Sequence, residues 1–253
     1  MNIRGTWTLF RKEIQRFIEV WTQTLAAPVV SNLLFFVIFG VAMAGRDSGF
    51  EGLEYLQILV PGMVAMGIMN NAFGNPLGSI MIGKYTDAIT ELLMWPFKGF
   101  EIVLAYVAAA ILRGVVVGGI TLIVGSFFTD VLFTNIPFIL LMAGLIGMAF
   151  ASFGIIVGVL AKTFDQSAMI QNFAMQPLIF LGGVFFSLSQ LDGVMLTIAK
   201  WNPLLYMIDG FRYGFIGQMD TSIGMSLGVT ISIALGLFFI ASWMFNSGYK
   251  LKS

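Results

Sequence analysis

Six stretches of about twenty apolar residues dominate the sequence, and five of them contain no charged residue. They cover residues 25–44, 55–77, 102–127, 137–161, 167–188 and 225–245, and only the third holds a charge, Arg113. A helix needs about 20 apolar residues to cross the hydrocarbon of a bilayer. Only 10% of the 253 residues are charged and the mean hydropathy is +0.92, against about 25% charged residues in soluble domains. We therefore predict an all-α integral membrane protein with six transmembrane helices, forming a single domain over residues 1–253.

Basic residues between the apolar stretches predict the orientation, because cytoplasmic connections are enriched in Lys and Arg. With a cytoplasmic N-terminus, the inner segments carry nine basic residues and the outer segments carry three. The inner residues are Arg4, Arg11, Lys12, Arg16, Lys84, Lys98, Lys162, Lys250 and Lys252, and the outer ones are Arg46, Lys200 and Arg212. We therefore expect both termini in the cytoplasm.

The residue inventory excludes several kinds of chemistry. The chain has no Cys and no His, so thiolate nucleophiles, disulfides, histidine-based catalysis and HExxH zinc sites have no residues to build them. The net charge is zero and no basic tract exceeds two residues, which argues against a nucleic-acid partner. We predict no catalytic residue and no metal site.

The first 24 residues predict an amphipathic helix. Apolar side chains recur at steps of four and three on one helical face, at Ile3, Trp7, Phe10, Ile14, Phe17 and Trp21. Two tryptophans and a basic face beside a membrane span favour a helix that lies in the cytoplasmic membrane interface and contacts lipids. The spacing is also heptad-like, so a coiled-coil or partner-binding helix is the alternative.

Two connections are long for a compact membrane protein: residues 78–101 on the inside and 189–224 on the outside. The inner one begins with G-x-x-x-x-G-K, Gly78 to Lys84, which is the spacing of a phosphate-binding loop. Such a loop follows a strand and has Ser or Thr after its Lys, whereas here Tyr85 follows Lys84 and a membrane helix precedes the motif. We therefore predict no nucleotide site in this chain.

After this motif the inner connection predicts a short amphipathic helix. From Thr86 to Phe97 the sequence is TDAITELLMWPF, with Asp87 and Glu91 four residues apart on one face. We expect three helical turns that end at Pro96, on the cytoplasmic side between two membrane helices.

Several motifs in this order resemble a family. They are the amphipathic N-terminal helix, the six spans, the pattern Glu91-Leu92-Leu93-x-x-Pro96, the outer run Leu181 to Ser187 (LGGVFFS), Asn202-Pro203, and Gly210 to Phe215 (GFRYGF). Together they look like the type-2 ABC transporter permeases, known as the ABC-2 family. Within that family the chain is similar to the YadH-type permeases of the bacterial inner membrane.

The resemblance implies a membrane subunit without an ATPase of its own, located in the bacterial cytoplasmic membrane. Two permease copies would assemble with two separate ATP-binding subunits, which would carry the ATP and Mg, and would export an amphipathic, lipid-linked or drug-like substrate. The inner helix would be the coupling helix that contacts the ATPase, through Asp87, Glu91, Leu92, Leu93, Trp95 and Pro96. The alternative for this helix is a plain connector between two spans.

For the outer segment, the resemblance implies short helices that dip back into the outer leaflet and close the pathway. Its candidate gate residues are Asn202, Pro203, Asp209 and Arg212. Asp209 and Arg212 are three residues apart on a helix, a spacing that favours a local salt bridge.

Arg113 is the most unusual residue of the spans, because a charge at the centre of a membrane helix costs about 2.5–3.5 kcal/mol on insertion scales. Candidate partners are Asn70, Asn71 and Asn75 in the second span and Gln171 and Asn172 in the fifth. A structural interhelical hydrogen bond or a snorkelling side chain is one interpretation; the other is contact with a substrate or a lipid phosphate in the translocation pathway. The spacings Gly114-x-x-x-Gly118 and Gly154-x-x-x-Gly158 permit close helix approach.

Two other function classes remain open at this point. An autonomous secondary carrier or channel would need no ATPase, but carriers usually place carboxylates or histidines at membrane depth, where this chain has a lone arginine. An integral-membrane enzyme would need two cooperating carboxylates in the bilayer, and Glu101, at the rim of the third span, is the one candidate with any depth.

Overall fold

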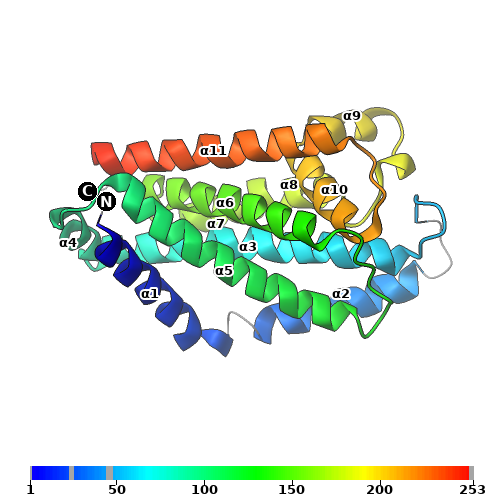
Figure 1. Cartoon of the computed structure of the whole chain (residues 1–253), viewed down its shortest axis with the longest axis horizontal. Coiled ribbons are helices and arrows are strands. Elements are labelled where there is room, and N and C mark those ends of the chain that lie inside the picture. Colours follow the sequence, from blue (N-terminus) through cyan, green and yellow to red (C-terminus); the bar gives the residue numbers. More distant parts are fainter. Residues whose placement is uncertain (1, 23–25, 44–47, 251–253) are drawn as a thin grey trace.

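The computed structural model describes residues 2–22, 26–43 and 48–250, and all regular secondary structure within them is helical. The helices form an elongated bundle (Figure 1). The start of α1 (Ile3–Glu19), the short helix α4 (Ala88–Met94) and the end of α11 (Ile223–Ser247) lie at one end of this bundle, and α9 (Gly193–Trp201) lies at the other. We call these the α4 end and the α9 end.

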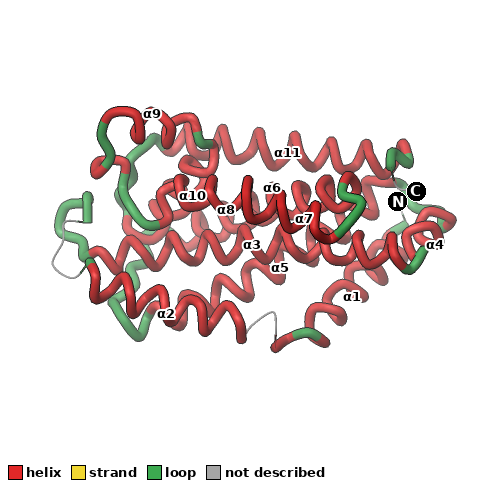
Figure 2. Tube along the Cα trace, turned by 180° about the vertical axis from the view of Figure 1, so that it is seen from behind, coloured by secondary structure: helices red, strands yellow, loops and turns green. Residues whose placement is uncertain are grey.

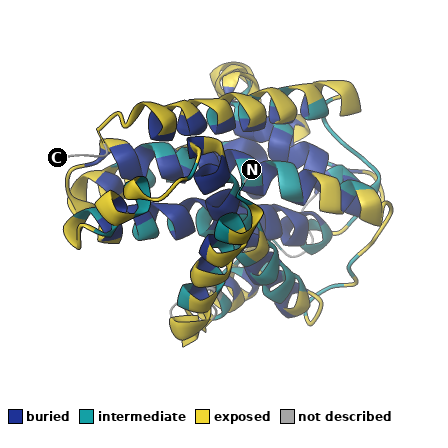
Figure 3. Cartoon of the chain, turned by 60° about the vertical axis from the view of Figure 1, so that its left-hand side comes forward, coloured by how far each residue is buried: buried dark blue, intermediate teal, exposed yellow. Residues whose placement is uncertain are grey.

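The centre of the bundle is α3 (Tyr55–Tyr85), which packs against α5 (Gly99–Gly125) and α6 (Ile136–Leu160), while α11 packs against α6. These four helices are long and apolar enough to cross a membrane. The side chains of α3 are buried along most of its length, including Met63, Met69 and Phe73, and buried residues concentrate in the middle helices of Figure 3, whereas the outer face of α11 is exposed. An apolar exposed face suits contact with lipid.

The remaining two predicted spans differ from regular membrane-length helices. The first corresponds to α2 (Ala27–Ala42), which has 16 residues and is about 24 Å long at 1.5 Å per residue. The fifth is a chain of short pieces: α7 (Phe164–Met169), a π-helical turn η2 (Ile170–Met175), α8 (Gln176–Ile179) and a second π-helical turn η3 (Phe180–Val184). Figure 2 shows α7 and α8 on the side of the bundle opposite α5. The count of six spans therefore stays a prediction.

The long connection predicted to lie outside, residues 189–224, folds into the bundle. After a short 3-10 turn, η4 (Leu188–Gln190), the chain forms α9 and then α10 (Pro203–Ile216), which packs against α11, α6 and α3. Asn202 and Pro203 form the start of α10: the Asn202 side chain accepts a hydrogen bond from the N–H of Leu204, and Pro203 occupies the first turn, where its missing N–H costs nothing. Most of α10 is buried, which accounts for the apolar character of this connection.

Helix α1 runs along α5, not only across its end. Near its start, the N–H of Asn2 donates to Oε1 of Glu101 at 2.7 Å, and near its end the ring of Phe17 lies 5.8 Å from the guanidinium carbon of Arg113. Glu101 and Arg113 are about 18 Å apart along α5. Of the apolar face predicted for α1, only Phe17 is buried, and Trp7 and Trp21 are exposed. The side toward the bundle is instead formed by Leu9, Glu13 and Phe17.

Candidate functional site

The helix α4 is anchored by its apolar side chains, of which Ile89 is the most buried. Ile89 is 3% exposed and packs against the backbone of Gly83, where an added Cβ would come within 3.1 Å of Ile89 Cγ1. Glu91 and Trp95 are exposed at the α4 end of the bundle, and Leu92 and Leu93 are half-buried. The α4 segment therefore exposes an acidic side chain, Glu91, and a large apolar one, Trp95, while Ile89 fixes it to the bundle.

The helix differs in extent from the sequence prediction. It has seven residues, two turns instead of three, and it ends at Met94, before Trp95 and Pro96. Asp87 precedes the helix in a left-handed conformation, with φ 57°, so Asp87 and Glu91 do not occupy one helical face as predicted. The physical reason is that α3 continues through Gly78 to Tyr85, which leaves a tight corner for the chain to turn.

Five polar side chains from three helices meet where α1 passes α3 and α5. Glu13 and Arg16 of α1 form an ion pair at 3.0 Å, and the Glu13 side chain is 1% exposed. Arg16 Nη2 also donates to the main-chain oxygen of Asn75 at 2.7 Å and to Asn75 Oδ1 at 3.1 Å. Arg113 Nη1 donates to the same Oδ1 at 3.2 Å, and Ser79 donates to Glu13 at 2.6 Å. We call this group the arginine cluster.

Arg113 is near the middle of α5 in sequence, yet it lies near the level of the N-terminal end of α2. Asn32 of α2 donates to Thr121 of α5 at 2.7 Å, and the two helices run in the same direction (Figure 1). Ala27, the first residue of α2, is five residues before Asn32 and so about 7.5 Å below it. Arg113 is eight residues before Thr121, so it lies about 12 Å below it along α5. Measured along the bundle, the start of α2 is therefore within about one helical turn of the level of Arg113. The cluster thus lies close to the level of the start of α2.

One narrow face of α3 remains half-exposed in an otherwise buried helix. It carries small and amide residues at helical spacing: Gly67, Asn70, Asn71, Gly74 and Gly78. Asn70 Oδ1 accepts a hydrogen bond from Gln176 of α8 at 2.6 Å, and Asn71 donates to the carbonyl of Gly67 at 3.1 Å. Asn172 is exposed on η2. The partner of Arg113 is therefore Asn75, one of the predicted candidates, while Asn70 and Asn71 have other partners.

At the α9 end, buried polar side chains hold the broken end of the fifth segment. Gly183 has a φ of 85°, in the left-handed region, and its carbonyl accepts a hydrogen bond from Arg212, which is 1% exposed. The hydroxyl of Tyr55 donates to the carbonyl of Phe185 at 2.8 Å. Asp220 accepts from the Ser187 hydroxyl at 2.7 Å and from the N–H of Leu188 at 2.8 Å. Carbonyl and N–H groups released by the turn are thus satisfied by side chains.

The predicted ion pair between Asp209 and Arg212 is not formed. Asp209 accepts hydrogen bonds from the N–H groups of Asp220 and Thr221 at 3.1 and 2.8 Å and from the Thr221 hydroxyl at 2.6 Å. The Asp209 carboxylate is thus hydrogen-bonded to these three donors, and Arg212 donates to the carbonyl of Gly183 instead. Asp209 therefore fixes the connection between α10 and α11, and Arg212 fixes the end of the fifth segment.

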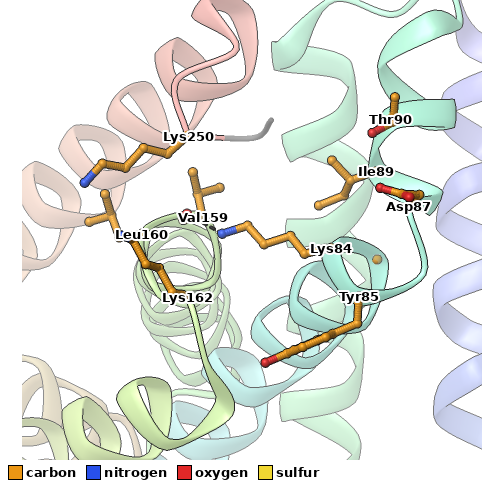
Figure 4. Close-up of a pocket in the computed structure, with 10 residues that line it drawn as sticks. Lys84, Tyr85, Asp87, Ile89, Thr90, Val159, Leu160, Lys162 and Lys250 are labelled. Carbon is orange, nitrogen blue, oxygen red and sulfur yellow. Dashed lines mark hydrogen bonds between the residues drawn. The ribbon is translucent and has the colours of Figure 1, made fainter. Parts of the chain in front are cut away.

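The G-x-x-x-x-G-K stretch lies inside α3 and is helical. Lys84 Nζ donates to the carbonyls of Val159 and Ala161, the last turn of α6 (Figure 4). A cation at a helix C-terminus satisfies carbonyls that have no helical partner. Lys84 thus acts as a cap for a neighbouring helix, at the edge of a cavity of about 820 Å³ that Lys162 and Lys250 also line.

The sequence matches the model of the ABC-2 type transporter family over residues 4–216. The chain belongs to the ABC-2 type transporter family. It is 35% identical over 246 residues to the inner membrane transport permease YadH of Escherichia coli, covering 97% of this chain and 96% of that protein. It is 27% identical over 229 residues to nodulation protein J of Sinorhizobium fredii, covering 87% and 86% of the two chains, and 25% identical over 232 residues to that of Rhizobium meliloti, covering 88% and 87%.

In this ABC-2 transporter subunit, sequence reasoning found Arg113 but missed Glu13 and Arg16. Glu13 lies beside Phe17, at the edge of the predicted apolar face, and Arg16 lies further round the helix. A signal was present, because Leu9, Glu13 and Phe17 recur every four residues and Glu13 is the first acidic residue in a basic helix. Arg46 and Lys252, which entered the charge argument for the orientation, lie outside the described residues.

Proposed function

We propose that the chain is the membrane-spanning permease subunit of an ATP-driven exporter in a bacterial inner membrane, with both termini in the cytoplasm. Two copies would pair, and each would bind a separate ATP-binding subunit that supplies ATP and Mg. The family supports a transport role, and the name of the Escherichia coli relative supports the membrane. The single observation that carries the coupling role is the exposure of Glu91 on α4, and of Trp95 directly after it, on a segment held by the buried Ile89.

The contact with the ATPase would use both the charge and the apolar area of α4. Trp95 is 64% exposed and Met94 is 75% exposed, and apolar side chains of this size at the tip of a protruding helix are typical anchors of a protein interface. Asp87 and Glu91 add two negative charges, which would steer a basic groove on the partner. Their position directly after α3 joins this contact to the most buried helix of the bundle.

The pathway would run along the half-exposed face of α3. This face is flanked by α2 and by the fifth segment: Phe39 of α2 stacks on Phe185 at 4.8 Å, and Gln176 of α8 binds Asn70. Both flanking elements expose apolar side chains, including Val37, Ile38 and Phe173. A polar stripe between apolar walls suits an amphipathic, lipid-linked or drug-like substrate, and a second copy would close the open side.

The decisive experiment is affinity purification of the tagged chain from its native membrane in mild detergent, with mass spectrometry and an ATPase assay. We expect a soluble ATP-binding protein at about one copy per chain, with vanadate-sensitive hydrolysis. The double variant Asp87→Lys, Glu91→Lys should lose at least tenfold of this partner, because two like charges then face the site that accepted two opposite ones. Membrane insertion should be unchanged.

A matched control is Glu19→Lys, a charge reversal at another exposed residue, at the end of α1. It should retain the partner at the wild-type level. Recovery of the chain alone, together with substrate movement in vesicles that contain only this protein and an ion gradient, would refute the proposal and favour an autonomous carrier.

A further inference from the structure

The arginine cluster holds several buried donors that have nothing to bind. Arg16 Nε, Arg113 Nε and Asn75 Nδ2 are buried and have no hydrogen-bond partner. They account for three of the six such side-chain atoms in the described part of the chain. An unsatisfied buried polar group costs about 1–3 kcal/mol, so three on adjoining residues call for a common explanation. All three atoms are N–H donors, which indicates a missing acceptor.

The charge of the cluster points to the same kind of ligand. Arg16 and Arg113 both donate to a single amide oxygen, Asn75 Oδ1, and two like charges share it. Glu13 supplies one negative charge, already bound by Arg16 and by Ser79. The cluster is therefore left with one net positive charge in partly buried surroundings, a state that is costly unless a counter-charge is bound. An anion with several oxygens would satisfy both the charge and the donors.

Space for such a group adjoins the cluster. A cavity of about 170 Å³ lies between α1 and the junction of α3 with α4. Its polar lining comprises Lys12, Arg16, Ser79, Thr86 and Tyr106, together with Glu13, so the cluster borders it through Arg16, Ser79 and Glu13 and not through Arg113 or Asn75. Two cations and three hydroxyls outnumber the one carboxylate. Guanidinium groups bind phosphate oxygens through paired N–H donors.

The depth of the cluster identifies the source of the phosphate. It lies close to the level of the start of the apolar helix α2, which is the level at which the chain would enter the hydrocarbon. Trp21, which is 57% exposed and follows the end of α1, is a side chain that prefers the headgroup region. Basic pockets between membrane helices on the cytoplasmic side suit lipid headgroups.

We propose that the arginine cluster binds the phosphate group of an anionic lipid of the inner leaflet, with Arg16 and Arg113 as donors and Asn75 as a third. Glu13 holds Arg16 in place from the opposite side. Because the site carries a positive charge and Lys12 beside it, a phospholipid with a cationic choline group binds less well than one with an uncharged glycerol group. This site is independent of any ATPase partner.

The test uses the full chain, purified in detergent and freed of lipid, titrated with phosphatidylglycerol or phosphatidylcholine and followed by native mass spectrometry. We expect phosphatidylglycerol to bind more tightly. Arg113→Gln should weaken its binding about tenfold or more, the usual loss for a hydrogen bond to a charged group. Arg113→Lys keeps the charge without the forked donors and should show a smaller loss. The matched control Arg11→Gln removes an exposed charge from the same helix as Arg16 and should bind as the wild type does.

Folding is checked on each variant by its elution as a single species, and the Arg113→Lys variant keeps the test valid if Arg113→Gln fails to fold. Equal binding of phosphatidylglycerol by the wild type and by both Arg113 variants would overturn the proposal, since ordered water would then satisfy the donors. Equally tight binding of inorganic phosphate at the same concentration would show that the phosphate group need not belong to a lipid, and would overturn the lipid part of the proposal. Tighter binding of phosphatidylcholine than of phosphatidylglycerol would overturn the argument that the positive charge of the site selects an anionic lipid.

Discussion

Three glycines of α6 make different contacts and allow a graded test of the central packing. A Cβ added to Gly154 would overlap the carbonyl oxygen of Phe73 on α3, with the carbonyl carbon at 3.0 Å and Cα at 3.2 Å. A Cβ on Gly158 would meet Ile80 Cβ at 3.2 Å, and a Cβ on Gly144 would meet nothing within 4 Å. The first contact is an overlap with the backbone of α3, whereas the second is only slightly tight and is relieved by a shift of a few tenths of an ångström.

The expected free energies follow from two opposing effects. Gly→Ala gains about 1 kcal/mol of helix propensity in a helix interior. Overpacking a core costs about 1–3 kcal/mol, because a gap of about 0.5–1 Å between helices already forfeits a quarter to a half of the local dispersion attraction. Gly144→Ala should therefore stabilise by up to about 1 kcal/mol, Gly158→Ala should be nearly neutral, and Gly154→Ala should destabilise by up to about 2 kcal/mol after the gain in propensity.

The assay is reversible unfolding of the purified chain in mixed micelles of mild detergent and SDS, followed by tryptophan fluorescence. The three midpoints should fall in the order Gly144→Ala, Gly158→Ala, Gly154→Ala, from most to least stable. If Gly154→Ala were as stable as Gly144→Ala, α3 and α6 would not approach backbone to backbone, and the close packing described for this pair of helices would be wrong.

Two further predictions concern side chains that bind main-chain groups. Lys84→Met should lower the unfolding free energy by about 1.5–3 kcal/mol, because charged hydrogen bonds to the end of α6 are lost; Lys162→Met, on an exposed side chain, serves as control, and equal stability of the two would exclude the capping role. Asp220→Asn should speed proteolysis of the outer connection severalfold, since the Ser187 and Leu188 donors lose a charged acceptor. Asp192→Asn, also outer but exposed, should leave the cleavage rate unchanged, and a similar increase in both would contradict the assignment.

The membrane helices were the most predictable part of the fold. The predicted span 137–161 is observed as Ile136–Leu160, and the predicted span 225–245 lies within Ile223–Ser247. This success has a physical cause: in lipid a helix must satisfy its own backbone groups and be long enough to span, so an apolar run of that length has few alternatives. Sequence patterns could not show how deep each helix sits, and so Arg113 was placed at mid-membrane by its position in α5 alone.

Contacts between segments far apart in sequence were not predictable in the same way. The local spacing of Asp209 and Arg212 suggested a pair, but the fold brings the Gly183 carbonyl to Arg212 and two loop N–H groups to Asp209. The π-helical turns of the fifth segment leave no periodic signal, although the neighbouring Gly182 and Gly183 mark the break. Glu13 was missed because burial of a charge depends on its partner, and Arg16 and Ser79 join it only in three dimensions.

Helix α3 has one mechanical consequence for transport. Its 31 residues make a rod of about 46 Å, with α4 attached at one end and Tyr55, which holds the Phe185 carbonyl, at the other. About a pivot a third of the way along, a tilt of about 5° moves the far end of this rod by about 3 Å. Under the proposed coupling role, a force on α4 would cross only the turn at Thr86 and Asp87 before it acted on this one helix. The cluster around Asn75, a third of the way along, is in the position of the fulcrum.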